Sequence, residues 1–378
     1  MLNGLSRLTI ATVPRKVKCV SCDLDRYASE VLKEGEMSSK RVTLADVAKR
    51  AGLSSAAASM ILNGRPDTRL SQAAHDRVIA AAEELGYRPN VAARGLRTDK
   101  THTIGFISDV VATTRFASGL IKGALEAAEA AGHVVLVLET GGEPKRETEA
   151  IAAVLDRQVD GIVFATMRAR ELFVPSVPAG TPVVMLNATN AHHHVSVLPD
   201  EETGGRMAVR LLAEQGHRAG IALIGQSDTV EKDAFRSATV ARRVRGVRSE
   251  MAERNLEFVA EESIWLWEPE PGYAATKALL ERRDDVKALL CMNDRLAFGA
   301  YQAIAELGLS VPDDISIVSF DNDEVAAYLR PGLTTLALPH EAMGRTAVEL
   351  LLSGERAGET LLPMPVIERA SIAAPRAT

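Results

Sequence analysis

The spacing of apolar residues changes near residue 100 of the chain. Before this point, apolar residues recur every three or four positions, which is typical of helices that bury one face. Three short helices are expected, with inner faces made of Leu44, Val47, Ala48 and Ala51, then Ala58, Ile61 and Leu62, and then Val78, Ala82 and Leu85. Thr43 and Ser54 precede the first two helices and are good N-cap residues, and Gly52 lies between these helices. The pattern therefore predicts a compact helical block between residues 41 and 87.

Beyond this block, short apolar runs alternate with amphipathic helices. The first part comprises expected strands over 102–108, 133–139, 160–166 and 182–188, with helices over 119–132 and 146–157 between them. The same alternation resumes after residue 207 and continues to residue 321. Buried strands that alternate with helices are typical of parallel sheets covered on both faces. Because about 275 residues are too many for one small lobe, we expect an α/β body of two lobes.

Charge is distributed unevenly along the chain. The net charge is −6, but residues 40–98 carry ten basic and five acidic side chains, which gives +5 there and −11 elsewhere. A basic head on an acidic body indicates that the head contacts a polyanion. Aromatic residues make up 4% of the chain, which argues against stacking on single-stranded nucleic acid.

The remaining composition predicts a cytoplasmic protein. Three cysteines do not make a disulfide framework, no apolar run reaches the length of about 18 residues that spans a bilayer, and the N-terminus is weak as a signal peptide. Cys19 and Cys22 lack a second pair for a four-ligand zinc site. The consecutive histidines 192–194 alternate faces and converge poorly on one ion. We therefore expect no metal and no cofactor, and we expect no catalytic residues, because glycine-rich nucleotide loops and a nucleophile elbow are missing from the sequence.

The helical block has the order of a helix-turn-helix. A short helix, a glycine-containing turn and a second capped helix place that second helix in the DNA major groove. Its outward face presents Ser55, Ala56, Ser59 and Met60. An ordinary helical hairpin is the alternative interpretation, and the basic charge of the block favours DNA.

The segments VTLADVAKRAGLSSAAASMILNG (42–64) and LSQAAHDRVIAAAEELGYRPNVAARGLRT (70–98) closely resemble the head of the LacI/GalR repressor family. The resemblance implies an all-α, lambda-repressor-like head in which Ser55, Ala56 and Met60 face the bases. The family commonly has Thr-Val-Ser-Arg where this chain has Ala57-Ala58-Ser59-Met60. An arginine reads guanine, whereas alanine and methionine offer apolar contact to a thymine methyl. The resemblance thus implies DNA binding, while the departure at these positions leaves the operator sequence open.

Phosphate contacts are expected from Thr43, Ser54 and Asn63, because short polar groups and helix N-termini fix the register on the duplex without reading sequence. The segment after Pro89 is a very short helix that is unstable alone. In the family that it resembles, this hinge folds when two copies meet in the minor groove. The resemblance implies that Leu96 is the wedge between base pairs and that Ala93 is its neighbour in the groove.

Residues 102 to about 374 resemble the family's effector domain, which has the fold of periplasmic sugar-binding proteins. The most specific stretches are AEQGHRAGIALIG (213–225), CMNDRLAFGA (291–300) and VPDDISIVSFDNDEVAAYLRPGLTTL (311–336). Open parallel sheets bind ligands at the carboxyl ends of their strands. A small sugar-like effector is therefore expected between the lobes.

Five residues are candidates for binding the effector: Asn187, Arg243, Trp267, Asn293 and Asp321. The last four match ligand-binding positions of the family that the chain resembles, and Asn187 ends an expected strand. Carboxylates and amides can bind paired hydroxyls, an arginine fork can hold a hydroxyl pair or a phosphate, and a tryptophan ring suits the flat face of a sugar. For each residue the alternative is a loop cap or a buried structural polar group, and the same alternative applies to Asp294.

The sequence thus predicts four segments. Residues 1–39 are an extension that is disordered or precedes the true start, residues 40–88 are the helix-turn-helix domain, residues 89–101 are the hinge helix and linker, and residues 102–378 are the two-lobed domain for effector binding and dimerisation. The expected function is that of a homodimeric repressor on palindromic double-stranded operator DNA, controlled by a sugar-like effector. A corepressor-dependent regulator that binds a purine is the alternative, and a sugar-processing enzyme is a more remote one.

Overall fold

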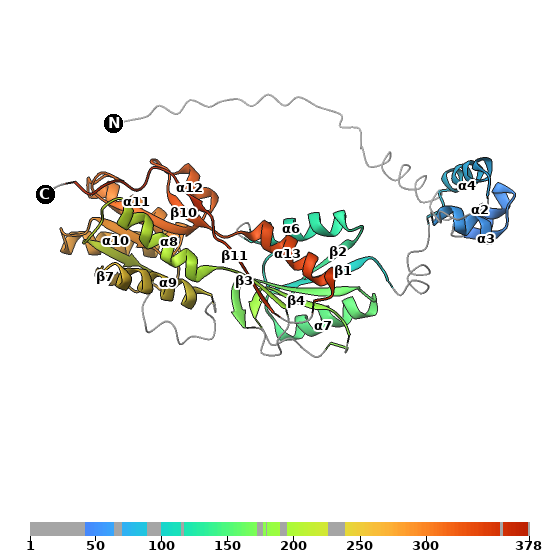
Figure 1. Ribbon diagram of the computed structural model, residues 1–378, viewed down its shortest axis with the longest axis horizontal. Helices are drawn as coiled ribbons and strands as arrows, with labels where there is room; N and C mark the ends of the chain where they lie inside the picture. The colour runs from blue at the N-terminus through green and yellow to red at the C-terminus, as the bar shows by residue number, and fades with distance from the viewer. Residues whose placement is uncertain are drawn as a thin grey trace, which may run out of the picture. The chain divides into compact units, whose positions relative to one another are not determined.

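The chain divides into two compact units, Met1–Asn90 and Val91–Thr378, which hold a helical head and a body of two lobes (Figure 1). The computed structural model describes residues 42–63, 70–88, 100–114, 117–171, 177–178, 180–189, 195–225, 239–355 and 358–376.

The head contains α2 (Leu44–Ala51), α3 (Ser55–Leu62) and α4 (Gln72–Glu84). Its core is made of small and branched side chains: Val47, Ala48, Ala51, Ala58, Ile61, Ala74, Val78, Ala81 and Ala82. Between α2 and α3, Gly52 has a φ of 69°, a left-handed conformation that glycine adopts without steric cost. This turn brings α3 across α2, which confirms the predicted helix-turn-helix.

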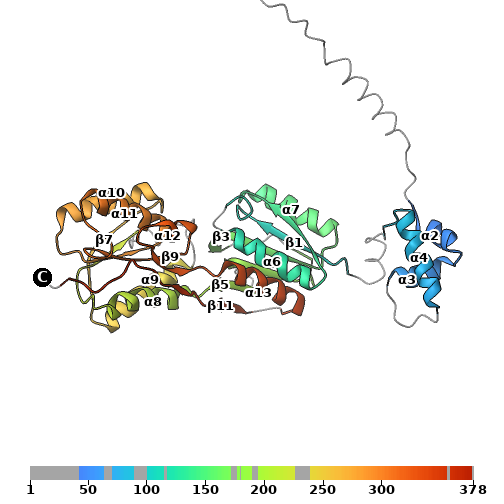
Figure 2. The same ribbon diagram turned by 90° about the horizontal axis from the view of Figure 1, so that it is seen from above.

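Lobe 1 is a parallel sheet between helices. Its strands are β1 (Thr103–Ser108), β2 (Val134–Glu139), β3 (Gly161–Glu171), β4 (Val183–Thr189), β5 (Val195–Pro199) and β11 (Glu359–Leu362), in the order β11-β5-β4-β3-β1-β2. Helices α6 (Ser118–Ala130) and α13 (His340–Ser353) cover one face and α7 (Pro144–Asp156) covers the other (Figure 2). Each registered strand pair of this sheet is parallel, as the alternating sequence predicts.

Lobe 2 repeats this plan. Its strands are β6 (Ile221–Ile224), β7 (Phe258–Glu262), β8 (Ala288–Cys291), β9 (Ser316–Asp321), β10 (Thr334–Ala337) and β12 (Val366–Ile367), in the order β12-β10-β9-β8-β6-β7. The helices α8 (Glu201–Glu214), α9 (Val240–Glu253), α10 (Pro269–Arg282), α11 (Asp294–Glu306) and α12 (Glu324–Tyr328) complete the lobe. Figure 2 shows α8 and α9 on one side of the sheet and α10 and α11 on the other. The short strand β12 is antiparallel to β10, which the expectation of parallel sheets did not include.

The chain passes between the lobes three times: from β5 into α8, from β10 into α13, and from β11 into β12. The predicted two-lobed α/β body is therefore confirmed, and each lobe is assembled from separate stretches of sequence.

Glycines set the distance between α8 and α9. A Cβ added to Gly205 would lie 2.1 Å from the backbone oxygen of Arg243, and one added to Gly246 would lie 2.0 Å from that of Glu202. Real Cβ atoms do not approach oxygen so closely, so the two helices can cross here because both positions lack a side chain. This crossing brings the N-terminal turns of α8 and α9 together at the candidate site.

Candidate effector site and DNA-binding head

The four residues expected to face the bases lie on one helix of the head. In α3, Ser55 and Ala56 are exposed and Ser59 and Met60 are half-buried. The opposite side of α3 packs into the core of the head through Ala57, Ala58 and Ile61, which are all buried. This division leaves a surface of small and apolar side chains on α3, without a long cationic group.

The three residues expected to bind phosphates cap helices. Thr43 and Asp46 form a capping box, in which the Asp46 amide donates to the Thr43 hydroxyl at 3.3 Å and the Thr43 amide donates to the Asp46 carboxylate at 2.9 Å. The Ser54 hydroxyl accepts a hydrogen bond from the Ala57 amide at 3.2 Å. Asn63 Nδ2 donates to the backbone oxygen of Ser59 at 2.6 Å. The predicted hinge residues Ala93 and Leu96 lie outside the described residues.

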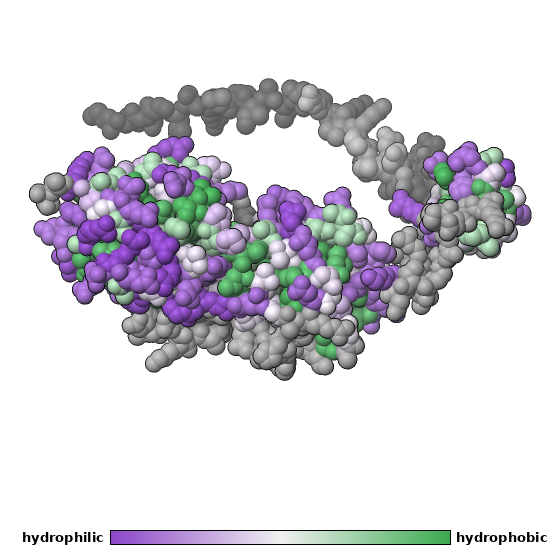
Figure 3. Space-filling view, in the orientation of Figure 1, coloured by the Kyte–Doolittle hydropathy of each residue, from purple (hydrophilic) through white to green (hydrophobic). Residues whose placement is uncertain are grey.

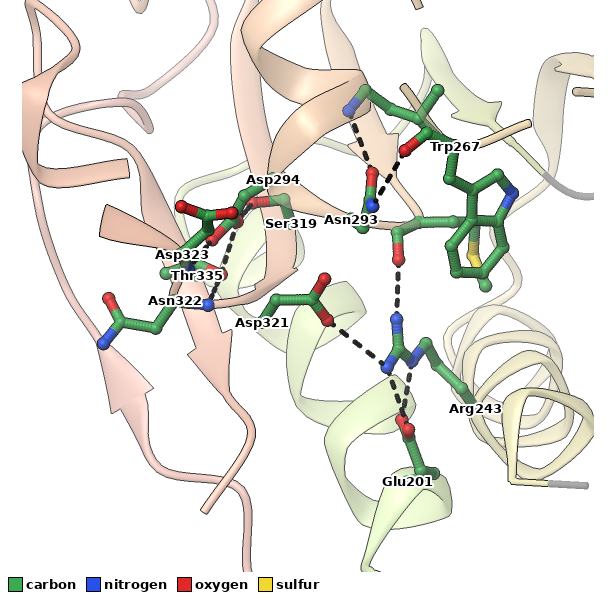
Figure 4. A network of polar contacts seen from close by, with 12 residues as sticks. Glu201, Arg243, Trp267, Asn293, Asp294, Ser319, Asp321, Asn322, Asp323 and Thr335 are labelled. Carbon is green, nitrogen blue, oxygen red and sulfur yellow. Dashed lines mark hydrogen bonds and ion pairs between the residues drawn. The ribbon is translucent and has the colours of Figure 1, made fainter. Parts of the chain in front are cut away.

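Arg243 is the centre of the polar network in lobe 2 (Figure 4). Its Nε and Nη2 donate to the two carboxylate oxygens of Glu201 at 2.6 and 2.9 Å, and its Nη1 donates to the backbone oxygen of Met292 at 2.6 Å. The guanidinium lies over the ring of Phe320, 4.2 Å from the ring centroid. Nη2 is also 3.9 Å from Oδ1 of Asp321. Two of the predicted residues, Arg243 and Asp321, are therefore neighbours, and they lie beside Glu201, which was not predicted.

Asp321 ends β9 in an unusual backbone conformation. Its φ is +108° and that of Asn322 is +55°, so the chain turns sharply where the strand ends. Burial raises the pKa of the Asp321 carboxyl well above its ordinary value, and the positive charge of Arg243 opposes this rise. Asn322 accepts a hydrogen bond from Arg369 at 2.8 Å, which holds the turn.

Asp294 supports the neighbouring loop. Its carboxylate accepts hydrogen bonds from the hydroxyls of Ser319 and Thr335 and from the backbone amide of Asp323, the last two both at 2.7 Å. Burial raises the pKa of Asp294 to about 6, and these three hydrogen bonds oppose that rise. The contacts join β9, β10 and the start of α11, as expected for a structural polar group.

Asn293 and Trp267 lie beside Arg243 but use their polar atoms within the lobe. Asn293 caps α11, since its Oδ1 accepts from the Leu296 amide at 2.9 Å. The Trp267 Nε1 donates to the backbone oxygen of Gly225 at 2.7 Å, and its half-buried ring packs against the core of lobe 2. Both residues fix the ends of strands β6 and β8 at this edge of the sheet.

Asn187 lies in lobe 1, at the carboxyl end of β4. Its φ is +51°, and its Nδ2 donates to the backbone oxygens of Thr166 and Met167 at 2.9 and 3.1 Å. Thr166 in turn donates to the Asn187 backbone oxygen at 2.5 Å. The side chain therefore joins β4 to β3, and the structure does not place it with the lobe 2 residues.

An ion pair joins the two lobes next to this network. Arg242 of α9 donates to both carboxylate oxygens of Glu359 in β11, at 2.7 and 2.8 Å. The Arg242 guanidinium holds the pKa of Glu359 below its ordinary value. Because Arg242 and Arg243 are consecutive, α9 contributes one arginine to the bridge between the lobes and the next to the candidate site.

The described residues contain neither a cluster suited to a metal ion nor a helix suited to a membrane. No group of three or more His, Cys, Asp or Glu side chains among them is arranged to hold a metal ion, and the histidines 192–194 lie outside this part of the chain. In the same described ranges, no helix has both the length and the apolar character to span a bilayer.

Comparison with known proteins identifies the family. The family described as bacterial regulatory proteins, lacI family, matches residues 43–90, and a periplasmic binding protein-like domain matches residues 209–372. The HTH-type transcriptional repressor PurR of Aliivibrio fischeri (strain MJ11) is 32% identical over 320 residues, which cover 82% of this chain and 90% of that protein. The chain belongs to the lacI family of bacterial regulatory proteins.

Other members of the lacI family agree with this assignment. The ribose operon repressor of Haemophilus influenzae is 28% identical, over 82% of this chain and 91% of that protein. A crystal structure of the lac repressor dimer bound to operator and the anti-inducer ONPF is 27% identical with a TM-score of 0.74, covering 89% of this chain and 100% of that one. This lacI-family chain is thus a DNA-binding transcriptional repressor with a small-molecule effector, and its relatives are regulators rather than enzymes.

Proposed function

We propose that this lacI-family repressor acts in the cytoplasm as a homodimer on a palindromic operator, and that a sugar-like effector controls its affinity for DNA. The observation that carries the proposal is the presence, in one chain, of a helix-turn-helix head and of a lobe in which Asp321 and Arg243 meet at strand ends. One helix-turn-helix reads few base pairs, whereas two heads one helical turn apart read a palindrome. The effector binds between the lobes at the carboxyl ends of the strands.

The proposed DNA surface uses two sets of residues. Ser55, Ala56, Ser59 and Met60 face the bases, and Thr43, Ser54 and Asn63 contact phosphates. The exposure of Ser55 and Ala56 supports the first set, and the position of the second set at helix ends supports phosphate contact. Since α3 offers no long cationic side chain, discrimination rests on apolar and hydroxyl contacts in the groove.

In the proposed effector site, Asp321 binds the ligand directly. Arg243, Trp267 and Asn293 hold the surrounding strand ends of lobe 2, and Asn187 holds the facing strand ends of lobe 1. No turnover of the ligand is expected from this site.

A purine corepressor is the second candidate effector. The specific observation in its favour is the 32% identity to a repressor named PurR, against 28% for a ribose operon repressor. The two candidate effectors change operator affinity in opposite directions. A sugar inducer lowers this affinity, whereas a purine corepressor raises it.

The test of the proposal is a titration of double-stranded DNA from the upstream region of the protein's own gene, followed by fluorescence anisotropy with and without sugars and purine bases. We expect nanomolar binding that weakens steeply with salt, because binding releases counterions from the phosphates. Equal affinity for this DNA and for random duplex would contradict sequence-specific repression.

Leu96→Ala tests the proposed hinge. Loss of an apolar wedge should lower operator affinity by about 10- to 100-fold, because the duplex is no longer unstacked and bent toward the protein. The thermal shift produced by the effector should not change. Unaltered operator affinity would remove Leu96 from the minor groove.

Asp321→Ala tests the proposed effector site. The variant should lose at least about 10-fold in effector affinity, because buried donors of the ligand are left unpaired. It should keep the operator affinity of the unliganded protein. A normal effector response in this variant would place the ligand elsewhere.

A further inference from the structure

One carboxylate holds the first residues of lobe 1 that follow the predicted linker. Asp160 lies directly before β3, and its Oδ1 accepts hydrogen bonds from the Thr101 amide at 2.7 Å and from the Thr101 hydroxyl at 3.1 Å. Its Oδ2 accepts from the amide of His102, directly before β1, at 3.0 Å. Thr101 also donates to the backbone oxygen of Gln158 at 2.9 Å. Asp160 therefore fixes the point at which the linker joins the body.

His133 lies against the same carboxylate. It directly precedes β2, so it meets His102 and Asp160 at the amino ends of three neighbouring parallel strands, away from the carboxyl ends where the effector is expected. Its ring centroid is 5.0 Å from that of His102. Its Nε2 is 3.4 Å from Oδ2 of Asp160, and both side chains are 9% exposed. Among the described residues, this buried Nε2 has no hydrogen-bond partner.

The other ring nitrogen limits the protonation states that His133 adopts. Nδ1 is 2.9 Å from the backbone oxygen of Ala131. A carbonyl oxygen only accepts hydrogen bonds, so Nδ1 carries a proton and donates it. The neutral ring then has a lone pair on Nε2 that faces the lone pairs of the Asp160 carboxylate. A second proton, on Nε2, converts this repulsive contact into a charge-assisted pair.

The charged groups around His133 leave Asp160 as its close acidic partner within the described ranges. His102 is the second titratable ring, and a proton on it would oppose a proton on His133. Charged side chains on the surrounding elements are exposed, so water and salt screen them: Lys100, Glu129, Asp156 and Arg157. The acid of the linker, Asp99, lies outside the described residues, and a variant below tests its contribution.

We propose that Asp160 and His133 form a proton-dependent anchor for the linker, through which operator affinity rises as the pH falls from 8 to 6. Histidine is the side chain whose charge ordinarily changes in this range. With its second proton, His133 holds the carboxylate in place against the amides of Thr101 and His102, and without that proton the anchor loosens. A firmly anchored linker loses less conformational freedom when the head binds DNA, which strengthens binding. The inference rests on the proposed operator binding.

Operator affinity at pH 6 and at pH 8 tests the anchor on the full chain, with the duplex from upstream of the protein's own gene. The wild type should bind about fivefold more tightly at pH 6. His133→Gln cannot take the second proton, and Asp160→Asn removes the charge that this proton pairs with, so both variants should bind equally at the two pH values. A pH-independent wild type, or a difference that persists in either folded variant, would overturn the proposal.

Three matched variants address other sources of a pH effect. His75→Gln removes the histidine of the head, His102→Gln removes the neighbouring ring, and Asp99→Asn removes the acid of the linker. Each should keep a ratio of at least about fivefold between pH 6 and pH 8. A ratio that disappears in His75→Gln or Asp99→Asn but persists in His133→Gln would locate the effect in the head or the linker, against the proposal.

NMR of ¹⁵N-labelled histidine side chains measures the protonation of His133 without DNA, and the signal is assigned from its loss in His133→Gln. The neutral ring should carry its proton on Nδ1 at pH 8 and gain one on Nε2 toward pH 6. A neutral ring protonated on Nε2 would contradict the anchor. Absence of specific operator binding at both pH values counts against the proposed function, whereas specific binding that ignores pH counts against the anchor alone.

Discussion

At the residue scale, two buried carboxylates of lobe 2 are stabilised in opposite ways. Glu250 accepts hydrogen bonds from Arg210, Arg254 and Arg206, which lower its pKa to about 2 against the effect of burial. Asp294 is surrounded by uncharged donors instead, and its pKa is raised to about 6. Figure 3 shows hydrophilic residues over the outer side of α8 and α9, where the arginines around Glu250 lie.

The Glu250 network makes the free energy of unfolding depend on pH in the acidic range. A folded pKa of about 2 lies below the ordinary 4.5, so the contribution of Glu250 is present above pH 4.5 and is lost as the pH falls toward 2. Glu250→Gln should therefore lower the free energy of unfolding by about 3 kcal/mol at pH 7. The difference in unfolding free energy between the variant and wild type should disappear near pH 2. Urea unfolding between pH 7 and pH 2 measures this difference.

Glu253→Gln is the matched control, because Glu253 pairs with the same Arg206 but is 58% exposed. Its effect should stay below about 1 kcal/mol. A pH-independent difference between Glu250→Gln and wild type would show that Glu250 acts through packing rather than charge.

At the same scale, the sequence indicated some site residues and missed others. Arg243 and Asp321 were predicted through the family resemblance, and they are neighbours in the structure. Glu201 was missed because nothing in the sequence distinguishes it from Glu202, and 42 residues separate it from Arg243. The side chain of Asn293 caps α11, which agrees with the alternative of a structural cap.

At the scale of elements, the sequence predicted most helices and strands within a few residues. The helix expected over 119–132 is α6, and the strand expected over 133–139 is β2. The elements that were not predicted are the strands β5, β7, β10, β11 and β12 and the helices α9, α12 and α13. Among them, β11 and β12 have four and two residues, which is too short to show a period. These two strands lie at the ends of their sheets, and local sequence does not encode pairing at a sheet edge.

The crossing of α8 and α9 gives a prediction about packing. Gly246→Ala puts a methyl group against the backbone oxygen of Glu202, so the helices must separate and the Glu201–Arg243 pair must lengthen. We expect a loss of about 3 kcal/mol or more in unfolding free energy, together with a weaker effector-induced thermal shift. Ser249→Ala, on the same helix, should cost about 1 kcal/mol at most; equal losses in the two variants would disprove a special role for the glycine.

At the scale of the whole body, the ion pair of Arg242 and Glu359 couples the lobes. It joins α9 to β11, and the residue after Arg242 belongs to the candidate site. Glu359→Gln should cost about 1 kcal/mol or less in stability, because the pair is partly exposed. The same substitution should also weaken the effector response: the ratio of operator affinities with and without effector should fall by about fivefold.

Two controls accompany this prediction. Exchanging the charges, as Arg242→Glu with Glu359→Arg, should restore much of the ratio. Glu126→Gln breaks an ion pair of similar exposure with Arg345 inside lobe 1 and should leave the ratio unchanged. Failure of the charge exchange combined with an effect of Glu126→Gln would indicate a general loss of rigidity instead of coupling between lobes.

The three passages of the chain between the lobes also dictate the order in which the body can be completed during synthesis. Lobe 1 begins at β1 but needs α13, whose Met343, Ala347 and Leu351 fill its core, and β11 at its edge. Nearly all of lobe 2 is translated before α13, so the lobe that starts first in the sequence finishes late. Until then α6 exposes the apolar face that α13 will cover, and a nascent chain stalled near residue 338 would be a natural client for chaperones.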